Sequence, residues 1–79
     1  MRLDKFLKVS RIIKRRTVAK EFCDAGKISI NKKQAKASDQ VSEGDVLQVI
    51  FGSRIIEYNV LSVKDHASKE DAKLMVKEH

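Results

Sequence analysis

RIIKRRTVAKEFCDAG, residues 11–26, has the pattern of a short helix that follows a run of cations and ends at a glycine. We expect the helix to start near Arg16, where the hydroxyl of Thr17 can cap it. Gly26 can adopt the left-handed conformation that ends many helices. The apolar side of this expected helix consists of Val18, Ala19, Phe22 and Cys23.

A first helix is expected before it, over residues 2–10. The pattern fails beyond Val9, because a continued helix would turn apolar residues toward its cationic side. We therefore expect a break near Ser10, and we expect residues 10–15 to connect the two helices. The apolar side of the first helix has the i, i+3, i+4 spacing and consists of Leu3, Phe6 and Leu7.

The following part of the chain has strand patterns separated by turns. Residues 27–31, KISIN, alternate like a short strand, and Asn31–Lys33 is expected to turn because asparagine tolerates positive φ. A further turn is expected at Glu43–Asp45. VLQVIF (46–51) and RIIEYNVLSV (54–63) are expected to form a hairpin across the two residues between them.

The C-terminal stretch SKEDAKLMVKEH, residues 68–79, is expected to form a short closing helix. Ser68 and Asp71 have the spacing of a capping box. Ala72, Met75 and Val76 would pack only weakly. The predicted fold class is α+β, with two N-terminal helices packed on a small, curved, mostly antiparallel sheet and a short helix at the C-terminus.

The length of 79 residues suits one domain with a single small core. We expect residues 1–66 to form this domain, including a strand extension, and residues 67–79 to form the C-terminal helix packed on it. The single cysteine fits a reducing cytoplasm. No apolar run approaches the ~18 residues that span a bilayer, so no membrane partner is expected.

Positive charge is concentrated in the first half of the chain. Residues 1–36 hold twelve Lys and Arg against three acids, a net charge of +9, whereas residues 37–79 hold five against eight, a net charge of −3. Such a one-signed field favours a polyanion, and nucleic acid is favoured over an acidic membrane surface. The alternative is a cationic face that only keeps the protein in solution.

The candidate nucleic-acid site consists of cations at the two helices and around the first strand. Outward-pointing amides at the start of the second helix would add a favourable dipole, and the Arg16 guanidinium could bind two phosphate oxygens. Asp4 either pairs with Lys8 at i, i+4 or orients a neighbouring arginine. The candidate RNA-binding residues are Arg2, Asp4, Lys5, Lys8, Arg11, Lys14, Arg15, Arg16, Lys20, Lys27, Asn31, Lys32 and Lys33.

Catalytic residues are not expected. His66 lies in an expected turn and His79 is the last residue, and neither has a partner at metal-ligand spacing. Cys23 lies on an apolar helix face, which favours a structural thiol over a nucleophile. The chain also lacks a glycine-rich phosphate loop. We therefore expect a noncatalytic protein with no cofactor and no metal.

Structured RNA is the favoured nucleic acid. The few aromatic residues mostly fall at core positions, so base stacking on single strands is disfavoured. The second helix carries few base-reading side chains beyond Lys20, so a DNA-binding regulator is the weaker alternative. Recognition of RNA through its shape and backbone fits the cations best.

The ordered motifs of residues 1–51 resemble the small RNA-binding domain named after ribosomal protein S-four. Two positions depart from the family pattern, since Lys32 stands where a turn glycine is usual and Ala37 where proline is common. The resemblance implies the same α+β fold and backbone-binding roles first for Arg2 and Arg16. The matching motifs are Arg16-Thr17 with Ala19, Ala25-Gly26, ISIN (28–31), Lys36 with Ser38, and Gly44-Asp45.

The short freestanding members of that family imply a more specific function. They imply binding to a large ribosomal subunit that still holds peptidyl-tRNA after a stalled ribosome has split. The protein would contact rRNA and the P-site tRNA, as a monomer, and would support RqcH in adding C-terminal alanine tails during ribosome-associated quality control. The alternatives are a ribosome-associated heat-shock or assembly factor that binds rRNA, and an RNA-modifying enzyme that has lost or recruits its catalytic partner.

Overall fold

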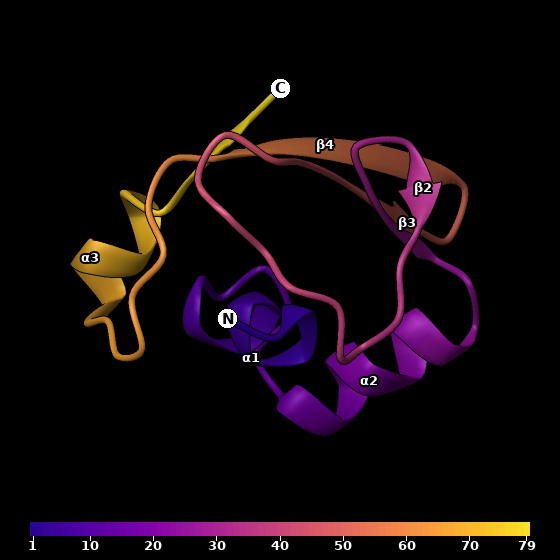
Figure 1. Ribbon diagram of the computed structural model, residues 1–79, viewed down its shortest axis with the longest axis horizontal. Helices are drawn as coiled ribbons and strands as arrows, with labels where there is room; N and C mark the ends of the chain where they lie inside the picture. The colour runs from indigo at the N-terminus through magenta and orange to yellow at the C-terminus, as the bar shows by residue number, and fades with distance from the viewer.

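The computed structural model describes residues 1–79 and shows an open antiparallel sheet with helices on one face (Figure 1). Its five strands have the order β2-β1-β3-β4-β5. This architecture confirms the predicted α+β class. None of the three helices has the length and apolar character needed to cross a membrane. The elements are α1 (Leu3–Val9), α2 (Arg16–Asp24), β1 (Ile28–Ile30), β2 (Lys33–Gln34), β3 (Val46–Phe51), β4 (Arg54–Val60), α3 (Lys69–Lys73) and β5 (Val76–Glu78).

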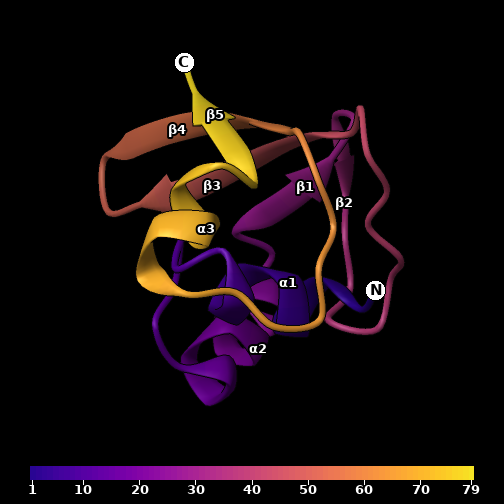
Figure 2. The ribbon, with the colours of Figure 1, turned by 90° about the vertical axis from the view of Figure 1, so that its left-hand side faces the viewer.

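The helices α1 and α2 lie together beneath the sheet, as Figure 1 and Figure 2 show from two directions. The apolar side of α1 faces the sheet, since Leu3, Phe6 and Leu7 are fully buried. The inward face of β3 supplies Leu47 and Val49, which are also fully buried. The helical spacing and the strand alternation predicted from the sequence are thus both confirmed, because each places its apolar residues on one buried face.

The end of α2 is formed by the predicted glycine. The Lys27 amide donates to the Phe22 carbonyl at 2.9 Å, and the Gly26 amide donates to the Cys23 carbonyl at 3.0 Å. These two bonds and the φ of 74° at Gly26 form a Schellman motif. The chain thereby reverses direction and enters β1.

The expectation that Thr17 caps α2 is wrong. Arg15 is the N-cap residue, with φ −114° and ψ 132°, and its side chain makes no capping hydrogen bond. The helix begins early enough for the Ala19 amide to donate to the Arg15 carbonyl at 3.0 Å, which places Thr17 inside the first turn. The first amides of α2 therefore have no side-chain cap from the protein.

The prediction of a helix over residues 68–79 is wrong for the second half of that range. The helix α3 ends at Lys73, although its predicted cap is confirmed by the Asp71 amide, which donates to Ser68 Oγ at 3.1 Å. Residues Val76–Glu78 instead form β5, which pairs with β4. The strand satisfies backbone groups along the β4 edge that a longer helix would leave open.

The expectation that the apolar residues of this segment pack weakly is wrong for Ala72 and Met75. Ala72 is 1% exposed and Met75 is 0% exposed. The Leu61 amide also donates to the Met75 carbonyl, at 2.7 Å. The C-terminal segment therefore contributes to the same core as α1 and β3.

A tight turn joins β1 to β2, a strand that the sequence analysis did not predict. Ile30 pairs with Lys33 across it, and the residues between them, Asn31 and Lys32, have φ values of 51° and 71°. The predicted turn is confirmed at these two residues, whereas Lys33 belongs to β2. Positive φ strains a lysine because its Cβ approaches the following carbonyl oxygen.

The variant Lys32→Gly is expected to stabilise the fold by about 0.5–1 kcal/mol, since relief of this strain exceeds the added entropy of the unfolded chain. Urea titration of the free energy of unfolding measures the effect. Lys33→Gly is the control and should lower stability, because Lys33 lies in a strand. A loss of stability in Lys32→Gly would contradict the strain.

Candidate nucleic-acid interface

Asp4 holds two arginines from separate elements at the start of α1. Its side chain is 5% exposed. Arg2 Nε lies 3.2 Å from Oδ1, and Arg16 Nε lies 3.3 Å from Oδ2. The Lys5 amide also donates to Oδ1, at 2.8 Å. Asp4 therefore orients arginines, and the alternative ion pair with Lys8 is not formed.

Both anchored arginines remain available to a ligand. The side chain of Arg2 is 49% exposed and that of Arg16 is 46% exposed. Each guanidinium directs Nε and one Nη toward Asp4, which leaves its other Nη free to donate. An arginine held in this way loses less conformational entropy on binding than a free one. We name the contacts among Arg2, Asp4 and Arg16 the Asp4 anchor.

The segment after β2 fixes the start of α1. The Leu3 amide donates to the Asp39 carbonyl at 2.8 Å, and the Asp4 amide donates to the Ala37 carbonyl at 3.2 Å. Ala37 is buried, and its small side chain permits the close approach of the two backbones. Backbone bonds from a distant segment thus help to fix the position of the Asp4 carboxylate.

The Asp4 anchor lowers the pKa of the Asp4 carboxyl below its ordinary value. Burial opposes ionisation, but the hydrogen bonds from Arg2, Arg16 and the Lys5 amide outweigh it. Because the folded-state pKa is depressed, ionised Asp4 stabilises the fold fully above the ordinary pKa of 3.8. This stabilisation is lost as the pH falls through the folded-state pKa.

Asp4→Asn is expected to remove this part of the acid sensitivity, because the amide does not titrate. The free energy of unfolding, measured from about pH 6 down to about pH 2, should fall less steeply in the variant below the ordinary pKa of aspartate. Asp65→Asn is the control, since the Asp65 side chain is 76% exposed and pairs only with Lys5. Identical pH dependence of the wild type and Asp4→Asn would contradict a depressed pKa at Asp4.

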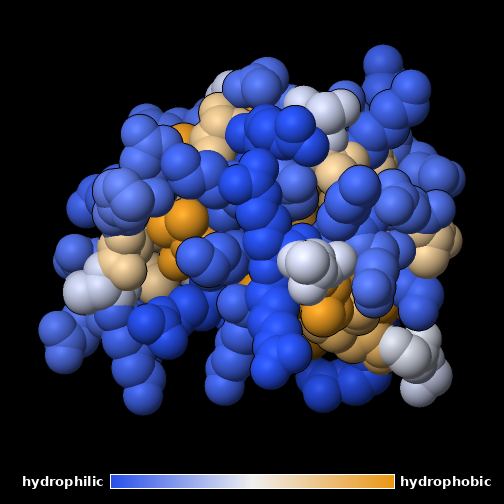
Figure 3. Space-filling model, turned by 90° about the horizontal axis from the view of Figure 1, so that it is seen from below, coloured by the Kyte–Doolittle hydropathy of each residue, from blue (hydrophilic) through white to orange (hydrophobic).

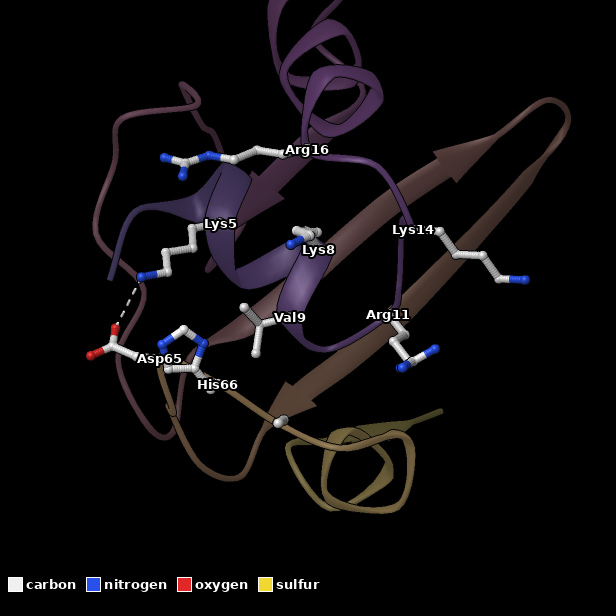
Figure 4. Close-up of a pocket in the computed structure, with 9 residues that line it drawn as sticks. Lys5, Lys8, Val9, Arg11, Lys14, Arg16, Asp65 and His66 are labelled. Carbon is white, nitrogen blue, oxygen red and sulfur yellow. Dashed lines mark hydrogen bonds and ion pairs between the residues drawn. The ribbon is translucent and has the colours of Figure 1, made fainter.

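A groove of about 440 Å³ lies beside Arg16, between α1, the connection that follows it and residues 65–67. We name it the basic groove, and Figure 4 draws the side chains that line it, with Val9 of α1 between the cations of α1 and those of the connection. Lys5 pairs with Asp65 at 3.3 Å, whereas Lys8, Arg11 and Lys14 have no ion-pair partner. The cations that line the groove are Lys5, Lys8, Arg11, Lys14 and Arg16.

The basic groove has the chemistry of a phosphate site. Adjacent unpaired cations repel one another, and phosphates placed among them would relieve that repulsion. The uncapped first turn of α2 starts at Arg16 and adds amide donors and a positive dipole end. Strongly hydrophilic residues cover most of the molecular face that carries α1 and α2 (Figure 3).

A second depression, of about 520 Å³, lies on the other side of the Asp4 anchor. Arg2, Lys20 and Lys36 supply its cations, and residues 34–38 form one wall. Lys36 was not among the candidate RNA-binding residues expected from the sequence. Because Arg2 lines this depression and Arg16 lines the basic groove, the Asp4 anchor connects two basic hollows.

Residues 1–47, more than half of the chain, match the family model described as S4 domain. The chain belongs to the S4 domain family. The match confirms the resemblance to the domain of ribosomal protein S-four. The matched residues include α1, α2 and the connection between them, and so contain the whole Asp4 anchor and all five cations of the basic groove.

The chain is also similar to individual proteins beyond residues 1–47. The RQC P-site tRNA stabilizing factor of Bacillus subtilis is 60% identical over 72 residues, which cover 91% of this chain and 84% of that protein. The protein of the same name from Halalkalibacterium halodurans is 53% identical, with coverages of 91% and 82%. The trimeric structure of Vibrio cholerae heat shock protein 15 superposes with a TM-score of 0.91 at 26% identity, over 100% of this chain and 81% of that chain.

The S4 domain does not bring every candidate cation to the basic groove. Lys27 lies past the far end of α2, where its Nζ is 5.2 Å from the centre of the Phe22 ring. Lys32 and Lys33 are exposed at the β1–β2 turn, and Arg15 is exposed at the start of α2 without lining the groove. The cations of residues 1–36 are therefore not all in one place: some line the basic groove, and others lie away from it.

Asn31 has a structural role within the S4 domain. Its side-chain amide donates to Asp45 at 3.1 Å and its side-chain oxygen accepts from the Val46 amide at 2.9 Å. These bonds connect the β1–β2 turn to the start of β3. Both bonds use the Asn31 side chain, which was expected from the sequence to contact RNA.

Three residues outside the S4 domain match, Asp65, His66 and Ala67, complete the lining of the basic groove. Asp65 and His66 line it, as Figure 4 shows. From the sequence, His66 was expected in a turn without a partner, and no role was expected for Asp65. No local sequence pattern predicts this position, because residues 65–67 reach α1 only through the path of the chain after β4.

Cys23 has the environment of a structural thiol. It is 3% exposed on the inner face of α2, and burial, followed by nearby carboxylates, raises its pKa to about 11. The thiol is therefore protonated at neutral pH. No group of three or more His, Cys, Asp or Glu side chains is placed to hold a metal ion.

Proposed function

We propose that this chain binds the large ribosomal subunit and stabilises the P-site tRNA during ribosome-associated quality control, without catalysing a reaction. The observation that carries the proposal is the Asp4 anchor, which presents half-exposed Arg2 and Arg16, with Arg16 in the same groove as the unpaired Lys8, Arg11 and Lys14. The name of the B. subtilis relative, RQC P-site tRNA stabilizing factor, supports it at 60% identity over 91% of this chain.

The geometry of the site suits the RNA backbone better than the bases. An anchored guanidinium can bind two oxygens of one phosphate, and the neighbouring lysines neutralise further phosphates. Bound counterions are released when phosphates enter such a groove, which makes the affinity high and salt-dependent. An RNA helix would then be recognised by its shape and its phosphates.

In this proposal the protein contacts rRNA and tRNA at once. The two basic hollows on either side of the Asp4 anchor offer separate places for two RNA elements. Holding the tRNA in the P site after a stalled ribosome has split would allow RqcH to add C-terminal alanine residues. The chain would act as a monomer in the cytoplasm.

A ribosome-associated heat-shock or assembly factor is the second candidate. The TM-score of 0.91 to heat shock protein 15 favours it, although the sequence identity there is only 26%. Such a factor would bind rRNA through the same basic groove but would not require a tRNA on the subunit. Bound tRNA therefore distinguishes the two candidates.

A pull-down of tagged protein from extract, followed by sucrose-gradient fractionation and RNA sequencing, tests the proposal. Large subunits enriched in tRNA, without matching small subunits, are the expected result. Large subunits without tRNA enrichment would favour the second candidate. Recovery of duplex DNA, or of no ribosomal RNA, would contradict both.

A further inference from the structure

A second groove continues the basic groove toward the C-terminus. It has a volume of about 450 Å³ and lies between the α1–α2 connection and the α3–β5 segment. Arg11 and Lys14 line both grooves, so the two are contiguous. In Figure 4, Arg11 extends from the connection on the side where α3 lies. We name the second hollow the C-terminal groove.

The far wall of the C-terminal groove adds two lysines. Lys69 and Lys73 are four residues apart on α3, which places them on one face of the helix, and both line the groove. Both are exposed, and neither forms an ion pair. They stand across the groove from Arg11 and Lys14, which are also unpaired. Glu78 is the one acidic residue in the lining.

These lysines are held in place by the core and do not belong to a loose end. Ala72 lies between them in sequence and is 1% exposed, and Met75 is fully buried just beyond α3. The strand β5 then pairs with β4, with Val76 opposite Val60. The α3 lysines therefore form a fixed wall, so binding a ligand requires little ordering of the backbone.

We infer that the α3 lysines extend the RNA-binding surface, so that an RNA backbone in the basic groove continues past Arg11 and Lys14 into the C-terminal groove. This inference rests on the proposed function. The four cations around a groove with one carboxylate create a local positive potential that a run of phosphates fits. The helix α3 would then take part in RNA binding, although Lys69 and Lys73 lie outside residues 1–47, which match the S4 domain.

The test compares two double variants of equal charge. Lys69→Ala/Lys73→Ala removes the groove lysines, whereas Lys64→Ala/Lys77→Ala removes two exposed lysines that line neither groove. Affinity for purified large ribosomal subunits and for a duplex RNA is measured over a range of salt. The groove variant should lose about tenfold in affinity, and its logarithmic salt slope should flatten by about 1.4–1.8. The control variant should change far less.

Each outcome decides the inference. Equal losses of affinity in both variants would show that only net charge matters. An unchanged affinity in the groove variant would show that α3 is not part of the interface. Either result would overturn the inference. If the wild type fails to bind subunits, the proposed function fails, and the duplex RNA comparison alone decides the C-terminal groove. Thermal melting checks folding, and Lys69→Gln/Lys73→Gln replaces the alanine pair if that pair is unfolded.

Discussion

Arg16→Ala is expected to weaken binding to large ribosomal subunits by about 10- to 100-fold, the range for loss of charge-assisted hydrogen bonds. Arg16 is the one residue that belongs to both the Asp4 anchor and the basic groove. Its removal takes away a pre-oriented guanidinium at the uncapped start of α2. Binding measured against salt should also show a flatter slope, by about 0.7–0.9 for each phosphate that the variant no longer neutralises.

Arg15→Ala is the matched control for this prediction. Arg15 is adjacent, exposed and equally charged, but it forms no ion pair and does not line the basic groove. Its loss should cost much less affinity. Arg16→Lys should recover only part of the loss, because an ammonium lacks the planar fork that can bind Asp4 along one edge and a phosphate along another. Equal effects of Arg15→Ala and Arg16→Ala would show that the Asp4 anchor has no bearing on binding.

The fold of the first half could be predicted because its signals are local. The spacing of Leu3, Phe6 and Leu7 sets the buried face of α1, and Gly26 supplies the positive φ that ends α2. Each signal lies within one or two turns of the element that it specifies. The hairpin of β3 and β4 is equally local, since a tight turn fixes its register.

The C-terminal half of the site could not be predicted because its signals are distant. The sequence of residues 68–79 fits both a helix and a helix followed by a strand, and the free edge of β4 decides between them. Residues 65–67 join the basic groove only because β4 ends beside α1. The two roles proposed for Asp4 were also open in the sequence, and the positions of Arg2 and Arg16 in space select one of them.

Met75→Ala is expected to lower the free energy of unfolding by about 2–5 kcal/mol, the usual cost of emptying a fully buried methionine site. That decrease is a large part of the total stability of a domain of this size. Met75 is 0% exposed and belongs to the same core cluster as Phe6 and Leu47. The C-terminal segment should therefore unfold together with the rest of the chain, in one transition seen by urea titration.

Leu74→Ala is the control, because the neighbouring Leu74 is 66% exposed and its truncation should change stability by less than about 0.5 kcal/mol. A small effect of Met75→Ala would mean that α3 and β5 detach from the core at little cost. The wall of the C-terminal groove would then lack a fixed position, since Met75 follows directly on the helix that carries Lys69 and Lys73. We therefore expect the stability of the core and the proposed extension of the RNA-binding surface to depend on the same buried side chain.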